Sequence, residues 1–423
     1  MPEVRLLDPY ADNMLCQQLG PIYSRLEALG SLIECPPRPK RLKDMPPHIR
    51  LRHLMQLRDF HIPREVEGRL FETIDLMVRE GYRYRDPAQP STFATLSGEA
   101  MRRKRPGMPA LAAACEGISG GGKTEASLRC LNSYPQQVIR HESFPGFIGA
   151  HLQVVWLSVD VPPSGKAEDL ARALMIAWDR VTCSGRFTSL LAKERFKNPM
   201  QVLDEWRQVA ASHFLGILHL DEIQNFFRLG SLEQRRKRKA RDGPPELSIV
   251  EDQCLRWILT LLNTWGIPVL FSGTPDGIGA LTKRLSTLER ITTGGYHALQ
   301  PFGSWDEEPF RKSFMGQLGH YQYVNTKLAI SDGLAELVFS LSGGVPRVII
   351  ALWIAANRLA LEEPQDTLTL DHFTKAADTF LAPLGPAIAA LRSQDPQRLA
   401  KYEDLVSRDL TFWPRFWESI GRE

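Results

Sequence analysis

The chain has 423 residues, of which 43% are hydrophobic and 24% are charged, and this is the composition of an ordinary globular protein. Its length fits two or three domains better than one. The net charge of +3 excludes a polycation or an acidic tail but is compatible with a local basic patch. No run of about 18 apolar residues occurs, so the sequence predicts no membrane-spanning helix. The N-terminal residues lack the charged start and apolar core of a secretory signal.

The cysteines and histidines give no sign of a metal centre. Six cysteines and ten histidines are scattered along the chain, with no CxxC pair and no zinc-type spacing. We therefore expect no metal site built from side chains alone, and free thiols in a reducing cytoplasm.

The first 95 residues differ from the rest of the chain. A helix is expected over residues 21–29, followed by a proline-rich basic stretch over residues 35–47, where the prolines disfavour both helix and central strand. Between residues 50 and 80, apolar side chains recur at helical spacing. We predict an N-terminal, mainly helical and basic extension over residues 1–95 that docks a partner.

From residue 108 the pattern changes to alternating strands and helices. Buried strands are predicted at residues 109–115, 152–159, 214–220 and 268–271. Helices are predicted between them, at residues 167–182, 200–212 and 248–264. This alternation predicts a parallel sheet covered by helices on both faces, and we assign it to an α/β core over residues 96–304.

After residue 305 the expected strands stop. Helices are predicted at residues 331–341, 347–361 and 370–391, the last interrupted near Pro383. They predict a C-terminal helical lid over residues 305–395, followed by an aromatic tail over residues 396–423.

The strongest motif is a phosphate-binding loop. Residues 117–124 read GISGGGKT and match GxxxxGK[ST] at every fixed position. The glycines let successive backbone N–H groups point inward, and the helix that follows adds its positive end. Lys123 is expected to neutralise the β- and γ-phosphates of ATP, and the Thr124 hydroxyl to ligate Mg²⁺. The expected nucleotide-binding residues are Gly117, Ile118, Ser119, Gly120, Gly121, Gly122, Lys123, Thr124 and Glu125.

The alternative for this motif is a glycine-rich loop that carries Lys-Thr by chance. The apolar run before the motif and the helix-forming segment after it favour the phosphate site.

A second part of such a site follows a buried strand. Residues 214–222 read FLGILHLDE, and Asp221 at the strand end is expected to hold the magnesium through water. Glu222 is expected to activate a water for attack on the γ-phosphate. The alternative is an exposed Asp-Glu pair that opens a helix. Adjacent Asp and Glu favour hydrolysis over phosphotransfer, and the sequence lacks the Asn-Lys-x-Asp motif of a guanine site.

Further positions are candidates for sensing the γ-phosphate. In PVLFSGTP, residues 268–275, Thr274 is our first choice and Ser272 the second, with a simple turn as the alternative. Arg347 in GGVPR opens a lid helix and is expected to act as a second sensor. Arg290, with Arg284 as second choice, is expected to reach the γ-phosphate of a neighbouring subunit. For these arginines the alternative is an ordinary solvated side chain.

In their order and spacing, GISGGGKT, QVVWLSVD, LHLDEIQNF, PVLFSGTP and GGVPR resemble the TnsC/TniB family of AAA+ ATPases, which regulate DNA transposition and are related to MuB. The resemblance covers roughly residues 105–395. It implies an α/β fold of the AAA+ type, with a P-loop parallel sheet flanked by helices. It also implies ATP-dependent assembly of copies on double-stranded DNA, as rings or filaments, and a link between a target-selection protein and a transposase.

Basic residues supply candidate DNA contacts. By the resemblance, the DNA-binding residues are expected around the helix at 167–182, at Lys166, Arg186, Lys193, Arg195 and Lys197. Residues 102–105 and 235–241 form two further basic clusters. Each Lys or Arg that neutralises a phosphate gives an affinity that is independent of base sequence and sensitive to salt. The alternative for each cluster is a solvated face or loop.

The tail contains Trp413 and Trp417, which are expected to dock on transposase or endonuclease subunits or else to pack on the chain itself. The N-terminal region is expected, by analogy, to meet the target-selection protein. About 30 residues after the last lid helix are too few for the winged-helix domain of replication initiators.

We therefore predict an ATP- and Mg²⁺-dependent, DNA-binding regulator of transposition in the bacterial cytoplasm. The alternative is an AAA+ ATPase of signalling or secretion that acts on protein partners without DNA.

Overall fold

The computed structural model describes residues 8–96, 108–229, 247–282 and 290–393. The chain forms two compact units, each assembled from segments that are distant in the sequence. The first unit comprises Met1–Ala28, Val66–Glu116 and Thr124–Ala298, and the second comprises Leu29–Glu65, Gly117–Lys123 and Leu299–Glu423. The predicted extension over residues 1–95 is thus shared between the two units, and the predicted domain boundaries stay predictions.

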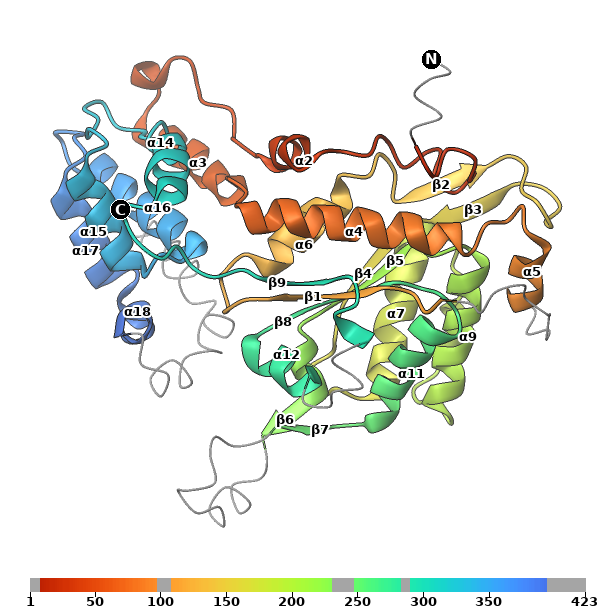
Figure 1. Cartoon of the computed structure of the whole chain (residues 1–423). Helices are drawn as coiled ribbons and strands as arrows, with labels where there is room; N and C mark the ends of the chain where they lie inside the picture. The colour runs from red at the N-terminus through yellow and green to blue at the C-terminus, as the bar shows by residue number, and fades with distance from the viewer. Residues whose placement is uncertain (1–7, 97–107, 230–246, 283–289, 394–423) are drawn as a thin grey trace, which may run out of the picture. The chain divides into compact units, whose positions relative to one another are not determined.

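A five-stranded parallel sheet forms the centre of the first unit (Figure 1). In spatial order its strands are β4 (Trp156–Asp160), β5 (Ile217–Asp221), β8 (Val269–Gly273), β1 (Ala112–Glu116) and β9 (Gly295–Ala298). Strands β5 and β8 are buried at every residue, as expected where helices cover both faces. The predicted α/β class with a parallel sheet is confirmed.

The register of the sheet brings polar residues together at its carboxyl edge. Asp160 at the end of β4 pairs with Asp221 at the end of β5, and Cys115 of β1 pairs with Ser272 of β8. Because all five strands run in the same direction, residues that are far apart in the sequence meet at this edge.

Helices cover the two faces of the sheet. On one face lie α7 (Ala167–Thr182), α9 (Pro199–Ser212) and α11 (Asp252–Asn263), and on the other lie α4 (Glu65–Arg83) and α6 (Lys123–Asn132) (Figure 1). The remaining helices of this unit include α5 (Pro90–Leu96), α8 (Thr188–Leu191), the 3₁₀ helix η3 (Ile223–Phe226) and α12 (Pro275–Thr282).

Side-chain periodicity explains why α7 forms as the sequence predicts. Leu170, Leu174 and Trp178 recur at helical spacing and are buried. Trp178 meets Trp206 of α9 edge to face, with ring centroids 6.1 Å apart. Asn198 caps the start of α9 by accepting a hydrogen bond from the Gln201 amide.

The strand predicted over residues 152–159 is wrong as a single element. It divides into β3 (His151–Val154), which pairs antiparallel with β2 (Val138–His141), and β4 of the main sheet. The amides of Val154 and Val155 donate to carbonyls of His213 and Gln137, so the two halves join different sheets. The sequence does not reveal this break, because both halves of the segment are mainly apolar and both are buried.

Other elements also differ from expectation. The predicted helix at residues 248–264 begins with a strand, β7 (Leu247–Ile249), paired with β6 (Phe227–Leu229), and α11 starts only at Asp252. Strand β9 was not predicted, because its sequence, GYHA, carries little strand propensity.

The second unit is helical among the described residues. Its lid helices are α14 (Met315–Leu318), α15 (Asp332–Ser342), α16 (Pro346–Glu362), α17 (Leu370–Thr379) and α18 (Gly385–Ser393). Shorter turns are η1 (Leu42–Asp44), the π-helical η4 (Pro309–Phe314) and η5 (Ala382–Leu384). The predicted interruption near Pro383 is present, since η5 separates α17 from α18. The segment α2 (Arg25–Leu32) runs from the first unit into the second.

Part of the N-terminal region packs into this helical unit. α3 (Pro47–Leu54) and the 3₁₀ helix η2 (Met55–Asp59) share one hydrophobic core with α16. Arg50 of α3 forms a buried ion pair with Asp366, with 2.7 Å between nitrogen and oxygen. Trp353 of α16 donates to the Tyr321 carbonyl at 2.8 Å.

Among the described residues, no single helix has the length and apolar character needed to cross a membrane, and only α15 and α16 taken together, bent by 115°, satisfy both. The predicted basic clusters at residues 102–105 and 235–241, the candidate Arg284 and the tail over residues 396–423 lie outside the described residues.

Candidate functional site

The loop Gly117–Lys123 joins β1 to α6, and its backbone requires glycine. Gly120 and Gly122 have φ angles of +80° and +95°, which other residues rarely adopt. A Cβ atom at position 117 would lie only 2.9 Å from the Leu299 carbonyl oxygen. The loop ends where α6 begins, at Lys123, so the positive end of the helix faces the loop.

Lys123 is buried in this loop, with 6% of its surface exposed. Within the described part of the chain it forms no ion pair with a carboxylate. A buried ammonium group is costly unless an anion compensates its charge. Lys123 therefore fits the predicted role of binding the phosphates of a nucleotide.

Arg64 is a further contact of the loop that sequence reasoning missed. Its Nη2 donates to the Gly121 carbonyl at 3.0 Å, and its Nη1 donates to the Gln300 carbonyl. The guanidinium carbon lies 5.8 Å from the centre of the Phe302 ring. The sequence does not predict this role for Arg64, because the two carbonyls that it contacts belong to residues more than 50 positions away.

Residues 299–302, which contact Gly117 and Arg64, also contact the turn before α16. The Phe302 amide donates to the Gly344 carbonyl at 3.0 Å, and Gly344 precedes Arg347 by three residues. Arg347 is exposed at the start of α16. Gly344 has φ +71°, and a Cβ there would lie 2.4 Å from the Phe302 carbonyl oxygen, so this contact requires glycine.

In the first unit, Asp221 is the centre of a hydrogen-bond network at the end of β5. Only 1% of its surface is exposed. Its Oδ2 accepts from the Thr124 hydroxyl at 2.5 Å, and its Oδ1 accepts from the Ser272 hydroxyl and, at 2.8 Å, from the Glu222 amide. Burial acts to raise the pKa of Asp221, but nearby His219 and the bonds from Ser272 and Thr124 outweigh it, so the pKa is lowered.

The donor set at Asp221 fits Mg²⁺. The predicted ligands, the Thr124 hydroxyl and the Asp221 carboxylate, lie within hydrogen-bond distance of each other. Both supply the hard oxygen atoms that Mg²⁺ prefers, often with water between metal and carboxylate. Asp160, opposite Asp221 in the register, is a further carboxylate that sequence reasoning missed, and burial followed by the charge of Asp221 raises its pKa.

Glu222 follows Asp221 in a left-handed backbone conformation, with φ +55°. This conformation is uncommon for a residue other than glycine and is concentrated at functional sites. The Glu222 carboxylate accepts a hydrogen bond from the Gln224 side-chain amide. The oxygen of that amide accepts from the Thr274 amide at 3.2 Å, so Gln224 connects Glu222 to the end of β8.

The two sensor candidates occupy different positions. Ser272 donates directly to Asp221, whereas the Thr274 hydroxyl accepts from the Gly277 amide at 3.4 Å. The Thr274 hydroxyl thus sits at the start of α12, in the manner of a helix cap. Of the two, the structure brings Ser272 to the carboxylate.

The predicted DNA-contacting residues form a basic segment, which we define as residues 186–197 together with Lys166. The side chains of Lys166, Arg186, Lys193, Arg195 and Lys197 are all exposed. Phe187 and Phe196 are buried and anchor the segment.

Arg172 of α7 holds the basic segment in place. Its Nη2 donates to the carbonyls of Lys193 and Glu194 at 2.7 and 2.8 Å, and its guanidinium carbon lies 4.3 Å from the centre of the Phe196 ring. Glu168 accepts from the Phe196 amide at 3.1 Å. Backbone contacts of this kind fix the segment while its basic side chains face solvent.

Arg290 is exposed and lies at the start of a described stretch, and its carbonyl accepts from the Thr293 hydroxyl at 3.2 Å. No neighbouring subunit is present in the structure, so the trans role of Arg290 stays a prediction.

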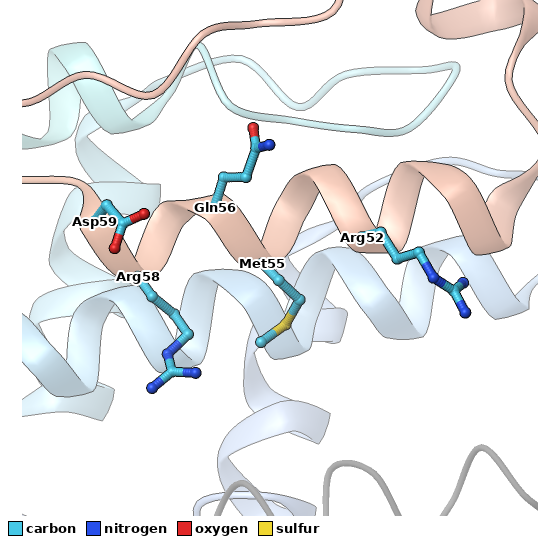
Figure 2. A pocket seen from close by; sticks show the side chains of 5 residues that line it. All are labelled: Arg52, Met55, Gln56, Arg58 and Asp59. Carbon is cyan, nitrogen blue, oxygen red and sulfur yellow. The ribbon is translucent and has the colours of Figure 1, made fainter.

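A hollow of about 500 Å³ lies elsewhere, in the second unit. Figure 2 shows its lining side chains, which come from α3 and η2: Arg52, Met55, Gln56, Arg58 and Asp59. Gln56 points away from Met55 and Arg58, so the polar groups do not converge as they do in a ligand site.

Comparison with known proteins agrees with this geometry. Residues 107–281 match the model of the AAA domain. No curated protein sequence matches the chain.

Two solved structures are similar at low level. The structure of Drosophila ORC bound to DNA has a TM-score of 0.42 and 13% identity, over 92% of this chain and 76% of that one. The Aeropyrum pernix ORC2 protein, in ADPNP-ADP complexes, has a TM-score of 0.41 and 13% identity, over 72% of this chain and 66% of that one. Scores this low establish no shared function. The match over residues 107–281 and the parallel sheet with its phosphate-binding loop agree with the α/β P-loop fold of an AAA+ ATPase.

Proposed function

We propose that the chain is an ATP-dependent regulator of DNA transposition that assembles on double-stranded DNA. The observation that carries this proposal is the exposed basic segment held by Arg172, in a chain in which residues 107–281 match the AAA domain. The motifs that resemble the TnsC/TniB family support the choice of transposition.

ATP hydrolysis follows from the residues of the AAA domain. The loop amides and Lys123 would bind the phosphates, and Thr124 and Asp221 would hold Mg²⁺, which would neutralise charge on the phosphates. Glu222 takes a proton from the attacking water, and Ser272 fixes the Asp221 carboxylate. Arg347 and, from a neighbouring copy, Arg290 are the further groups that we propose at the γ-phosphate.

Contact with DNA follows from the basic segment. Its Lys and Arg side chains neutralise phosphates and release counterions, so binding is independent of base sequence. A regulator that loads on arbitrary target DNA uses contacts of this kind. ATP between neighbouring copies favours assembly on the duplex, and hydrolysis releases it. The N-terminal region meets a target-selection protein, and the aromatic tail meets transposase subunits.

The test is binding of a fluorescent duplex, measured by anisotropy with a non-hydrolysable ATP analogue and Mg²⁺. The wild-type chain is expected to bind, and Lys123→Ala is expected to bind at least about tenfold more weakly. Charge reversal at Lys193 is the second arm, with reversal at Lys327, a lysine equally exposed and outside the basic segment, as the matched control. Equal duplex binding by all four proteins, or none by the wild type, would overturn the proposal.

One observation favours the alternative of an AAA+ ATPase that acts on proteins. At the tip between β2 and β3, Phe147 is 38% exposed and Ile148 is fully exposed, and exposed apolar side chains often mark protein contacts. ATP hydrolysis that is unchanged by any duplex would favour this alternative.

A further inference from the structure

A histidine lies inside the strand that ends in Asp221. His219 has 0% of its surface exposed, in the otherwise apolar middle of β5. Its Nδ1 lies 2.8 Å from the Ser158 hydroxyl of β4, and its Nε2 lies 2.7 Å from the Ser272 hydroxyl of β8. A buried imidazole is costly unless both nitrogens have partners, and here both do, across three neighbouring strands.

The direction of each hydrogen bond follows from Asp221. An ionised carboxylate only accepts hydrogen bonds, so Ser272 gives its single proton to Oδ1 of Asp221. The Ser272 oxygen can then only accept from His219, which places a proton on Nε2. His219 is fully buried and both of its ring nitrogens contact serine hydroxyls rather than a carboxylate, so a charged ring would be costly there. The neutral ring then has no proton on Nδ1, which accepts from Ser158.

The other tautomer of His219 would change this arrangement. With the proton on Nδ1, the bare Nε2 would compete with Asp221 for the Ser272 proton. Asp221 would then lose one of the donors that fix its carboxylate. The tautomer of His219 therefore determines whether the Ser272 hydroxyl donates its proton to Asp221.

We propose that His219 is a positioning residue for the carboxylate of Asp221, and that Ser158 holds the tautomer that this role requires. The proposal deepens the proposed function, since it rests on Asp221 serving the Mg²⁺-ATP site. Groups that orient metal ligands through a second hydrogen bond commonly change metal affinity or activity by about 10- to 100-fold when removed.

The first test is steady-state ATP hydrolysis at varied Mg²⁺ by His219→Leu and His219→Gln. The leucine variant removes the donor to Ser272, and we expect the half-saturating Mg²⁺ concentration to rise about tenfold. The KM for ATP at saturating Mg²⁺ is expected to change less than about twofold, because the loop and Lys123 are intact. The glutamine variant can still donate to Ser272, and its Mg²⁺ requirement should return to within about threefold of the wild type.

The second test needs no nucleotide and no activity. Histidine labelled with ¹⁵N reports the tautomer by NMR, and His219→Gln assigns the signal of residue 219 among the ten histidines. We expect a protonated Nε2 and a bare Nδ1 in the wild type. Ser158→Ala is a small change at a half-buried site, and it is expected to shift the population toward a protonated Nδ1 and to raise the Mg²⁺ requirement about threefold.

The outcomes separate the two proposals. If the wild type hydrolyses no ATP, the proposed function fails, while the tautomer measurement still tests His219. If the wild type is active and His219→Leu has the same Mg²⁺ requirement, or if residue 219 carries its proton on Nδ1, the inference about His219 is overturned. Should the leucine variant fail to fold, judged by its melting temperature, Ser158→Ala and the tautomer decide the matter.

Discussion

The loop Gly117–Lys123 and the end of β5 use different means to build a site. The loop takes its binding groups from consecutive residues, since amides and one lysine follow each other along the chain. At the end of β5 the network joins three strands, since Ser272 of β8 donates to Asp221 and Ser158 of β4 contacts His219 of β5. The difference shows that a site made of consecutive residues can be recognised from a sequence motif. A site made across strands can be recognised only when the register of the strands is known.

Glu222→Gln gives the largest expected effect and tests the strand end alone. The variant keeps the loop but loses the carboxylate that accepts a proton, so kcat for ATP hydrolysis should fall about 100-fold or more. ATP affinity, measured by isothermal titration, should stay within about threefold. A kcat near the wild-type value would remove Glu222 from the chemistry.

Ser272→Ala and Thr274→Ala together test which of the two hydroxyls at the end of β8 contributes to hydrolysis. Ser272 contacts Asp221, so its loss should lower kcat about tenfold. The Thr274 hydroxyl contacts the start of α12, so its loss should lower the free energy of unfolding by about 1 kcal/mol. Hydrolysis rates and urea unfolding of both variants measure this. The reverse pattern would show that Thr274, and not Ser272, is the residue closer to the chemistry.

Arg64→Ala tests how far the loop depends on a distant residue. Loss of the bond to the Gly121 carbonyl loosens the loop, so the Kd for an ATP analogue should rise about fivefold, consistent with a charge-assisted bond that is partly exposed. Arg64→Lys is the matched control, since it keeps the charge but not the two-pronged contact. An unchanged Kd for both variants would show that the loop is self-sufficient.

Arg172→Ala gives the smallest expected effect. The basic side chains remain, but the backbone at Lys193 and Glu194 loses its donors, so duplex affinity should fall about threefold from the added cost of ordering the segment. The dependence of affinity on salt should keep its slope, because no phosphate contact is deleted. A changed slope would mean that Arg172 itself contacts DNA.

Much of the fold followed from the sequence for local reasons. The helix over residues 167–182 agrees with α7 at both ends, because its apolar stripe is regular. The loop motif placed the start of α6 at Lys123. The division of the 152–159 strand escaped prediction, because backbone pairing with His213 and Gln137 leaves no trace in side-chain pattern.

The candidate site divides in the same way. Asp221 and Glu222 were predicted, because a carboxylate after a buried strand is a local signal. The contact of Arg64 with the loop and the contacts of His219 and Ser272 do not follow from the sequence, since they join residues that are distant along the chain. The histidine in an otherwise apolar strand was the one available signal, because a fully buried imidazole requires partners.

The most direct test of the central claim is sedimentation velocity of the whole chain with a duplex, Mg²⁺ and a non-hydrolysable ATP analogue. We predict large nucleoprotein assemblies only when both the duplex and the analogue are present, and none with Lys123→Ala. A chain that sediments as a monomer beside free duplex under all these conditions would contradict the claim that ATP binding drives assembly on DNA.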